Sequence, residues 1–202
     1  MSTREPAEVR EEEILNACEK LYKKMNFRDV TIKEISAETS FSRPSIYNYF
    51  QTKEEIFLRL FEREYMLWGD ELEMIVASGV NAEMLPEKLA RSLEKRELML
   101  KLLAVNLYDI EENSRIERLI SFKKAYGRSI VLFDRILKKA FPDKTDTERR
   151  QMLLTAMQFL HGVYPYSHAT AKQIEAMDAV GIQHDNGSIY ELSLVGLKMI
   201  LK

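Results

Sequence analysis

Residues 42–53, SRPSIYNYFQTK, combine side chains that can contact a DNA duplex. Arg43 can donate two hydrogen bonds to a guanine edge, and Asn48 can pair with an adenine edge. The hydroxyls of Ser45 and Tyr47 can reach phosphate oxygens or base edges. With flanking positions added, the sequence predicts a DNA-contacting set of Thr31, Lys33, Ser42, Arg43, Pro44, Ser45, Tyr47, Asn48, Tyr49, Thr52 and Lys53.

Two short helices joined by a four-residue turn would position this set, as in a helix-turn-helix. The first helix follows Thr31 and turns two isoleucines inward, and Ser36 is small enough to let the two helices approach closely. Phe41 would fill the space between them. Ser42 would cap the second helix, which we expect to end at Phe50.

The flanking helix starts add contacts to the duplex backbone. Thr31 and Thr52 each begin a helix, and the free backbone N–H groups of a helix N-terminus suit phosphates. Lys53 places a positive charge beside one of these ends. Lys33 lies on the exposed side of its helix and can reach base or phosphate.

Composition favours an all-α protein. The 202 residues include only 7 Gly and 5 Pro, too few for the many tight turns of a sandwich or barrel. Ser or Thr is followed three residues later by Glu at five helix starts, the pattern of a capping box. These pairs are Thr31/Glu34, Thr52/Glu55, Ser114/Glu117, Thr145/Glu148 and Ser188/Glu191. The sequence therefore predicts about nine helices and no sheet.

Apolar residues at three- and four-residue spacing place these helices. We expect them at about 8–25, from 31, 42–50, 52–78, from 86, 96–106, 114–140, 145–164 and 188–201. Pro165 is expected to stop the eighth helix. Residues 167–187 are expected to form a loop with room for a helical turn at 172–179.

Two adjacent motifs resemble the tetracycline-repressor (TetR) family of bacterial transcription regulators. They are Ile46-Tyr47-Asn48-Tyr49-Phe50 and Thr52-Lys53-Glu54-Glu55-Ile56, within a resemblance that covers roughly residues 10–62. The resemblance implies a DNA-binding domain at 1–51 and a helical effector-binding and dimerisation domain at 52–202. It also implies that Arg43, Pro44, Ser45 and Tyr47 line the recognition surface, and that Thr31, Tyr47 and Lys53 touch phosphates.

The chain departs from the family pattern in two places. The turn has Ser40 where the family usually has glycine, and a left-handed Ser costs roughly 1 kcal/mol. The first helix begins with an acidic cluster where many relatives are basic. Such charge weakens nonspecific DNA binding, because phosphate neutralisation supplies most of that affinity.

The family resemblance also implies partners. It predicts a ligand-responsive repressor that binds a palindromic operator in double-stranded DNA as a homodimer, through residues 145–164 and 188–201. Gly196 would let a partner backbone come close. The alternative is a helical interaction or scaffold protein whose helix-turn-helix contacts a protein. A DNA-shift assay with the chain's own upstream region separates the two.

A small apolar effector is expected in a cavity lined mainly by aromatic side chains. The candidate residues are Tyr65, Trp68, Met99, Leu103, Phe122, Tyr126, Phe133, Phe159 and Tyr164. Ordinary core packing explains each of these residues as well.

No catalytic residue, cofactor or metal is expected. The sequence has no clustered glycines for a phosphate loop and no nucleophile elbow, and its three His do not fall at metal-ligand spacing. One Cys does not require an oxidising compartment, and no apolar run approaches the ~18 residues of a membrane helix. We therefore expect a cytoplasmic DNA-binding protein that is neither an enzyme nor bound to a membrane. Its net charge of −2 means that charge arrangement decides DNA binding.

Overall fold

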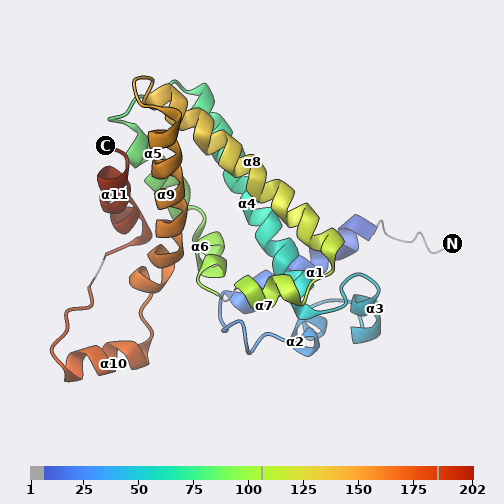
Figure 1. Cartoon of the computed structure of the whole chain (residues 1–202). Helices are drawn as coiled ribbons and strands as arrows, with labels where there is room; N and C mark the ends of the chain where they lie inside the picture. The colour runs from blue at the N-terminus through green and yellow to red at the C-terminus, as the bar shows by residue number, and fades with distance from the viewer. Residues whose placement is uncertain (1–6, 106, 186) are drawn as a thin grey trace. The chain divides into compact units, whose positions relative to one another are not determined.

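A computed structural model describes residues 7–105, 107–185 and 187–202, and every regular element in these ranges is an α-helix. The all-α prediction is therefore confirmed. The helices follow one another along the chain in Figure 1. Their bounds are α1 Ala7–Tyr22, α2 Ile32–Ala37, α3 Arg43–Tyr47, α4 Lys53–Ala77, α5 Leu85–Glu94, α6 Glu97–Leu103, α7 Leu107–Glu112, α8 Ile116–Ala140, α9 Asp146–Ser167, α10 Ala171–Ala179 and α11 Ile189–Ile200.

Two helices were not expected. Helix α7 has only six residues, too few for an apolar period to show in the sequence. Helix α10 has nine residues where one helical turn was expected, and its capping box uses Gln173 in place of the Glu of the predicted boxes. The expected helix end at residue 106 lies outside the described residues.

The prediction that Pro165 stops the eighth helix was wrong. Helix α9 continues through Pro165 to Ser167. The fixed φ of proline is compatible with a helix, and near the C-terminus the missing N–H removes one hydrogen bond only. The His168 amide then donates to the Tyr164 carbonyl at 2.9 Å and closes the last turn.

Reciprocal capping boxes form at three helix starts, those of α9, α10 and α11: Thr145/Glu148, Thr170/Gln173 and Ser188/Glu191. Two of these were among the five expected. At Thr31 the hydroxyl accepts from the Glu34 amide at 3.4 Å. At Thr52 it accepts from the Glu55 amide at 3.2 Å, but the Glu55 carboxylate bonds to other groups.

The helices divide into two compact units. The first takes the chain up to Arg63 together with Val105–Ala125, and the second takes Glu64–Ala104 with Tyr126–Lys202. Helices α4 and α8 contribute residues to both. No helix in the described part of the chain is long and apolar enough to span a bilayer.

The first unit surrounds a core of aliphatic and aromatic side chains. Phe57 of α4 meets Tyr22 and Phe27 edge-on, with ring centroids 5.1 and 4.6 Å apart. Phe61 packs on Phe122 at 5.2 Å. The fully buried residues Ile14, Leu15, Cys18, Ile35, Ile46 and Phe50 complete this core and bring α1, α2 and α3 together.

The second unit has a separate aromatic core. Trp68 lies 6.3 Å from Phe133 and 6.2 Å from Tyr65, and Tyr65 meets Tyr126 edge-on at 5.3 Å. Helix α11 packs against α5 and α9, as Figure 1 shows. None of the residues of α10 is buried.

Candidate nucleic-acid interface

Helices α2 and α3 form the expected pair of short helices. Ile32, Ile35 and Ile46 are buried on their inner faces. Pro44 lies in the first turn of α3, where its missing N–H costs nothing. Ser42 occupies the N-cap position, but its hydroxyl forms a hydrogen bond with the Ser45 hydroxyl at 2.9 Å instead of capping a backbone amide.

The turn between α2 and α3 is built without a left-handed residue. Ser36 donates to the Phe41 carbonyl at 2.8 Å across the turn. The Ser40 amide donates to Oε1 of Glu13 in α1 at 2.7 Å. No described residue other than glycine has a positive φ, so the strain expected at Ser40 is absent. A carboxylate from α1 thus supports a turn that usually relies on glycine.

Helix α3 presents several of the predicted DNA-contacting side chains to solvent. Arg43, Pro44, Tyr47 and Asn48 are exposed, and Tyr47 as a whole residue is 54% exposed. The other members of the set divide by exposure: Thr31, Lys33 and Ser42 are exposed, whereas Ser45, Tyr49, Thr52 and Lys53 are half-buried.

Lys53 and Thr52 have intramolecular partners. The Lys53 ammonium donates to the carbonyls of Phe27 and Val30 at 2.9 and 3.3 Å, and lies 4.4 Å from the centre of the Phe27 ring. The Thr52 hydroxyl donates to the Asn113 carbonyl at 2.9 Å. These contacts tie the segment between α1 and α2, and the segment between α7 and α8, to the start of α4, a role that the sequence motif did not suggest.

A fully buried carboxylate, Glu55, lies in the first turn of α4 and binds a guanidinium 60 residues away. Its oxygens accept from Nε and Nη2 of Arg115 at 2.6 and 2.8 Å. They also accept from the backbone amides of Gln51 and Arg115 at 2.8 and 3.1 Å. Burial raises the pKa of this carboxyl, but the hydrogen bonds and the charge of Arg115 outweigh it and hold the pKa below its ordinary value.

Two guanidinium groups converge on the C-terminal side of α3. Nη2 of Arg115 and Nη2 of Arg118 donate to the Tyr49 carbonyl at 3.2 and 3.1 Å. Arg118 also pairs with Glu11 of α1 at 2.8 Å. Sequence reasoning missed both arginines, because neither belongs to a local motif.

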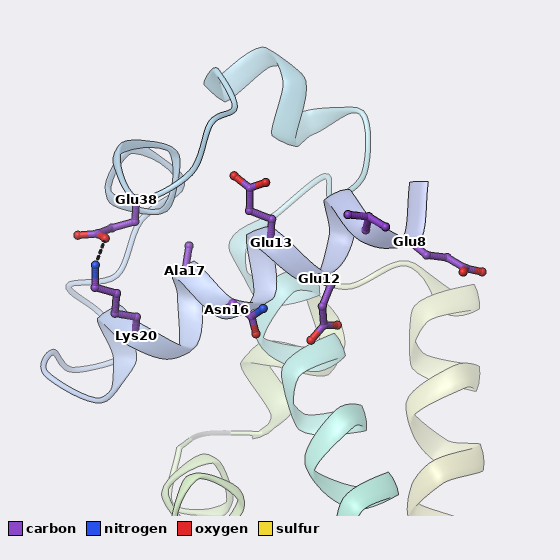
Figure 2. A pocket seen from close by; sticks show the side chains of 8 residues that line it. Glu8, Glu12, Glu13, Asn16, Ala17, Lys20 and Glu38 are labelled. Atoms are coloured by element: carbon purple, nitrogen blue, oxygen red, sulfur yellow. Dashed lines mark hydrogen bonds and ion pairs between the residues drawn. The ribbon is translucent and has the colours of Figure 1, made fainter. Parts of the chain in front are cut away.

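One face of α1 is acidic, as the sequence suggested. A groove of about 730 Å³ lies along it, with Glu8, Glu12, Glu13, Asn16, Lys20 and Glu38 among its lining residues (Figure 2). Lys20 pairs with Glu38, and Glu12 pairs with Arg63. Carboxylates dominate this acidic groove, so it repels phosphates and does not suit the duplex backbone.

The predicted cavity residues do not belong to one unit. Phe122 lies in the first unit, and the other eight, Tyr65, Trp68, Met99, Leu103, Tyr126, Phe133, Phe159 and Tyr164, lie in the second. The Trp68 indole N–H donates to the Ser92 hydroxyl at 3.2 Å, and the ring is almost fully buried. Burial raises the pKa of the Tyr65 and Tyr126 hydroxyls, so both stay neutral.

A groove of about 260 Å³ in the second unit is lined by none of those nine residues. Its walls are Glu71, Met74, Ile75, Ser78, Lys88, Arg91, Ser92 and Lys95. Ser92 connects its wall to Trp68 through the hydrogen bond described above. Four residues of this groove are charged, and no apolar stripe marks it in the sequence.

The two C-terminal helices that were expected to dimerise expose apolar side chains. Val195 and Met199 of α11 keep 61% and 68% of their surface, and Leu154 of α9 keeps 47%. Val195 and Met199 are four residues apart and therefore share one face of α11. Much of the α9 stripe is instead buried within the unit: Met152, Leu153, Ala156, Leu160 and Val163.

Gly196 is used within the chain. A Cβ atom there would lie 2.3–3.0 Å from three ring atoms of Phe159 in α9. The sequence suggested that a partner backbone would come close to Gly196, but the ring of Phe159 occupies this space. The expectation was incomplete because spacing alone does not show which neighbour fills a gap.

Comparison with known proteins agrees with this architecture. Residues 14–60 match the family described as bacterial regulatory proteins, tetR family, and residues 62–185 match the tetracyclin repressor-like C-terminal domain. The second match alone spans more than half of the chain. The protein belongs to the tetracycline-repressor family of transcriptional regulators.

Individual relatives share only part of their sequence with this chain. An uncharacterized HTH-type transcriptional regulator of Bacillus subtilis, YfiR, is 38% identical over 60 residues, which are 30% of this chain and 29% of that protein. The chain therefore matches less than a third of that relative's length.

Solved structures share the fold at lower identity. FadR from Bacillus subtilis, in complex with stearoyl-CoA, has a TM-score of 0.62 and 17% identity, covering 95% of this chain and 97% of FadR. FadR from Thermus thermophilus, in complex with lauroyl-CoA, gives 0.60 and 19%, covering 95% and 93%.

Proposed function

We propose that this regulator is a repressor that binds a palindromic operator as a homodimer and is released by a small apolar molecule. The observation that carries the proposal is the exposed face of α3 within a family-matched helix-turn-helix. Arg43 and Asn48 on this face can each form two hydrogen bonds with a base edge. Such a protein would act in the cytoplasm, and nothing in the proposal needs a catalytic step.

The two parts of the chain would have the functions that the family assigns to its N-terminal and C-terminal domains. Residues 1–51 would bind DNA, and residues 52–202 would bind the effector and dimerise. The DNA-contacting set is the one given by the sequence, with the exposed side chains on α3 reading bases. The half-buried Thr52 and Lys53 would have to exchange or share their present partners to touch phosphates.

The exposed apolar side chains of α9 and α11 support dimerisation through 145–164 and 188–201. Val195, Met199 and Leu154 would be covered by a second copy. A two-fold dimer would place its recognition helices about one or more duplex turns apart, roughly 34–36 Å. Light scattering at micromolar concentration tests the dimer directly. A monomer would refute the proposal that the protein binds a palindromic operator as a homodimer.

The predicted cavity residues, together with the aromatic core of the second unit, favour an apolar effector. The two FadR relatives hold acyl-CoA molecules, so stearoyl-CoA and lauroyl-CoA are the first probes to titrate. Trp68 fluorescence should respond if the probe binds beside it.

Selection of duplexes from a random library by the full-length protein tests DNA binding. Enrichment of one palindromic sequence supports the repressor proposal. If no sequence is enriched, and a protein partner is instead lost on replacing Arg43 and Tyr47, the interaction-protein alternative stands. Membership of the tetracycline-repressor family favours DNA over a protein as the partner of the helix-turn-helix.

Arg43 and Lys53 should differ in what they contribute to binding. Arg43→Ala is expected to weaken binding to the selected duplex by about 1–3 kcal/mol and to relax sequence preference, because a base contact is lost. Lys53→Ala is expected to weaken binding to all duplexes alike and to reduce the salt dependence of the affinity. Fluorescence anisotropy with selected and scrambled duplexes measures both. Equal losses on the two duplexes for Arg43→Ala would refute its role in base reading.

A further inference from the structure

We infer that Arg115 and Arg118 are positioning residues for DNA recognition, because they hold the C-terminal end of the recognition helix through the Tyr49 carbonyl. The inference rests on the proposed function and adds residues that lie outside the helix-turn-helix. We call these two guanidinium groups on one carbonyl the guanidinium clamp.

Helix α3 cannot fix its own position. It has five residues, and a helix of this length forms little more than one turn of its own hydrogen bonds. The amides of Tyr49 and Phe50 donate to the Ile46 carbonyl and continue the turn past the end of α3. The Tyr49 carbonyl lies on this last turn, two residues beyond the helix, where side chains act as its donors. It receives two N–H groups from positively charged side chains, and charged donors give the stronger hydrogen bonds.

The clamp is itself fixed at several points. Arg115 is held by Glu55, which is fully buried in α4. Arg118 is held by Glu11 in α1, and its guanidinium carbon lies 5.0 Å from the centre of the Phe50 ring. The Thr52 hydroxyl ties the segment before α8 to the start of α4 through Asn113. Tyr49 is thereby held from α1, α4 and α8 together.

Reading bases requires the recognition helix α3 to be placed accurately. Bidentate contacts from side chains such as Arg43 require placement to within about 0.5 Å. A loosened C-terminal end of α3 would misplace these groups, whereas nonspecific attraction to phosphates tolerates such movement. The clamp should therefore affect the ratio of specific to nonspecific affinity more than nonspecific affinity itself.

Arg118 is the better residue to test, because changing Arg115 leaves a buried carboxylate without its partner. Arg118→Lys keeps the charge beside Glu11 but lacks the planar guanidinium, which lies over the Phe50 ring, binds both oxygens of Glu11 and directs Nη2 at the Tyr49 carbonyl. Arg118→Gln removes the charge as well. Glu11→Gln leaves the bond to Tyr49 in place. Arg128→Gln is a matched control, since Arg128 also lies on α8 and pairs with two carboxylates, Asp70 and Glu73.

The affinity measurement uses the duplex selected by the wild-type protein and a scrambled duplex of the same length. Both Arg118 variants are expected to bind the selected duplex roughly tenfold more weakly, as expected for loss of a charged hydrogen bond. Arg118→Lys should keep scrambled-duplex affinity within about twofold. Arg128→Gln should bind both duplexes nearly as the wild type does. Glu11→Gln loosens Arg118 without removing its bond to Tyr49, so it should lose less affinity for the selected duplex than the Arg118 variants do. Wild-type affinity of Arg118→Lys for the selected duplex would overturn the inference.

Amide hydrogen exchange in the absence of DNA gives an independent reading. The amides of residues 49–51 should exchange faster in both Arg118 variants, while those in the middle of α1 stay unchanged. Unchanged exchange at 49–51 would overturn the inference. If the wild-type protein enriches no duplex, the proposed function fails, and exchange alone decides whether the clamp holds α3.

Discussion

Replacing Arg115 by leucine is expected to lower the free energy of unfolding by about 3 kcal/mol at neutral pH. The variant leaves the Glu55 carboxylate fully buried and removes two of its four hydrogen bonds. We take the low end of the range for a broken buried pair, because the Arg115 side chain is 40% exposed. Urea denaturation at a fixed protein concentration measures the loss.

The pH dependence of this loss has a definite sign. In the wild type the Glu55 pKa is lowered, so the charged carboxylate stabilises the fold above its ordinary pKa of 4.5. This contribution disappears as the pH falls through the folded-state value. In Arg115→Leu, burial favours the protonated acid, so the difference between variant and wild type should shrink as the pH falls toward 4.

Two controls isolate the buried charge. Arg128→Leu removes a guanidinium of similar exposure, 38%, whose carboxylate partners are themselves mostly exposed. It should cost no more than about 1 kcal/mol. Combining Glu55→Gln with Arg115→Leu should make the loss independent of pH. An Arg115→Leu loss equal to that of Arg128→Leu would show that Glu55 does not depend on this partner.

Replacing Gly196 by valine is expected to lower the free energy of unfolding by about 2 kcal/mol, the middle of the range for overpacking, because the Phe159 ring is only half-buried. The first added carbon alone would lie 2.3 Å from Cζ of Phe159, so the ring must leave its place between α9 and α11. Thermal or urea unfolding measures this cost, again at fixed protein concentration. Gly162→Val is the matched control, because a Cβ on that α9 glycine meets nothing within 4 Å.

A double-mutant cycle with Phe159→Ala tests the cause. If the ring creates the cost, Gly196→Val should be much milder in the Phe159→Ala background. If Gly196 instead accommodates a partner backbone, the cost should be the same in both backgrounds and should vary with protein concentration. The second outcome would support the expectation from the sequence that a partner backbone comes close to Gly196.

The sequence predicted the helix-turn-helix well, because its signals are local. The isoleucines of α2 and α3, the Thr31 cap and the first-turn Pro44 all act within a few residues. The all-α class followed from composition and capping patterns, which are also short-range. Helix ends were less accurate where one residue had two compatible roles, as Pro165 did inside α9.

The contacts around the recognition helix could not be predicted in the same way. Glu55 reads as a capping residue in sequence, yet its carboxylate binds Arg115, and the Tyr49 carbonyl binds two arginines more than 60 residues away. Nothing in the spacing of these residues announces such pairs. For the same reason, spacing could not show that Phe159 fills the gap at Gly196.

The shortness of α3 has a thermodynamic consequence. A free segment of this length would be disordered in water, and a protein that ordered it only on meeting DNA would lose conformational entropy at that moment. Here the ordering is completed during folding, by the buried Ile46 and the hydrogen bonds to Tyr49. The association step is then spared that entropy loss, and more of the contact free energy remains available to distinguish one base sequence from another.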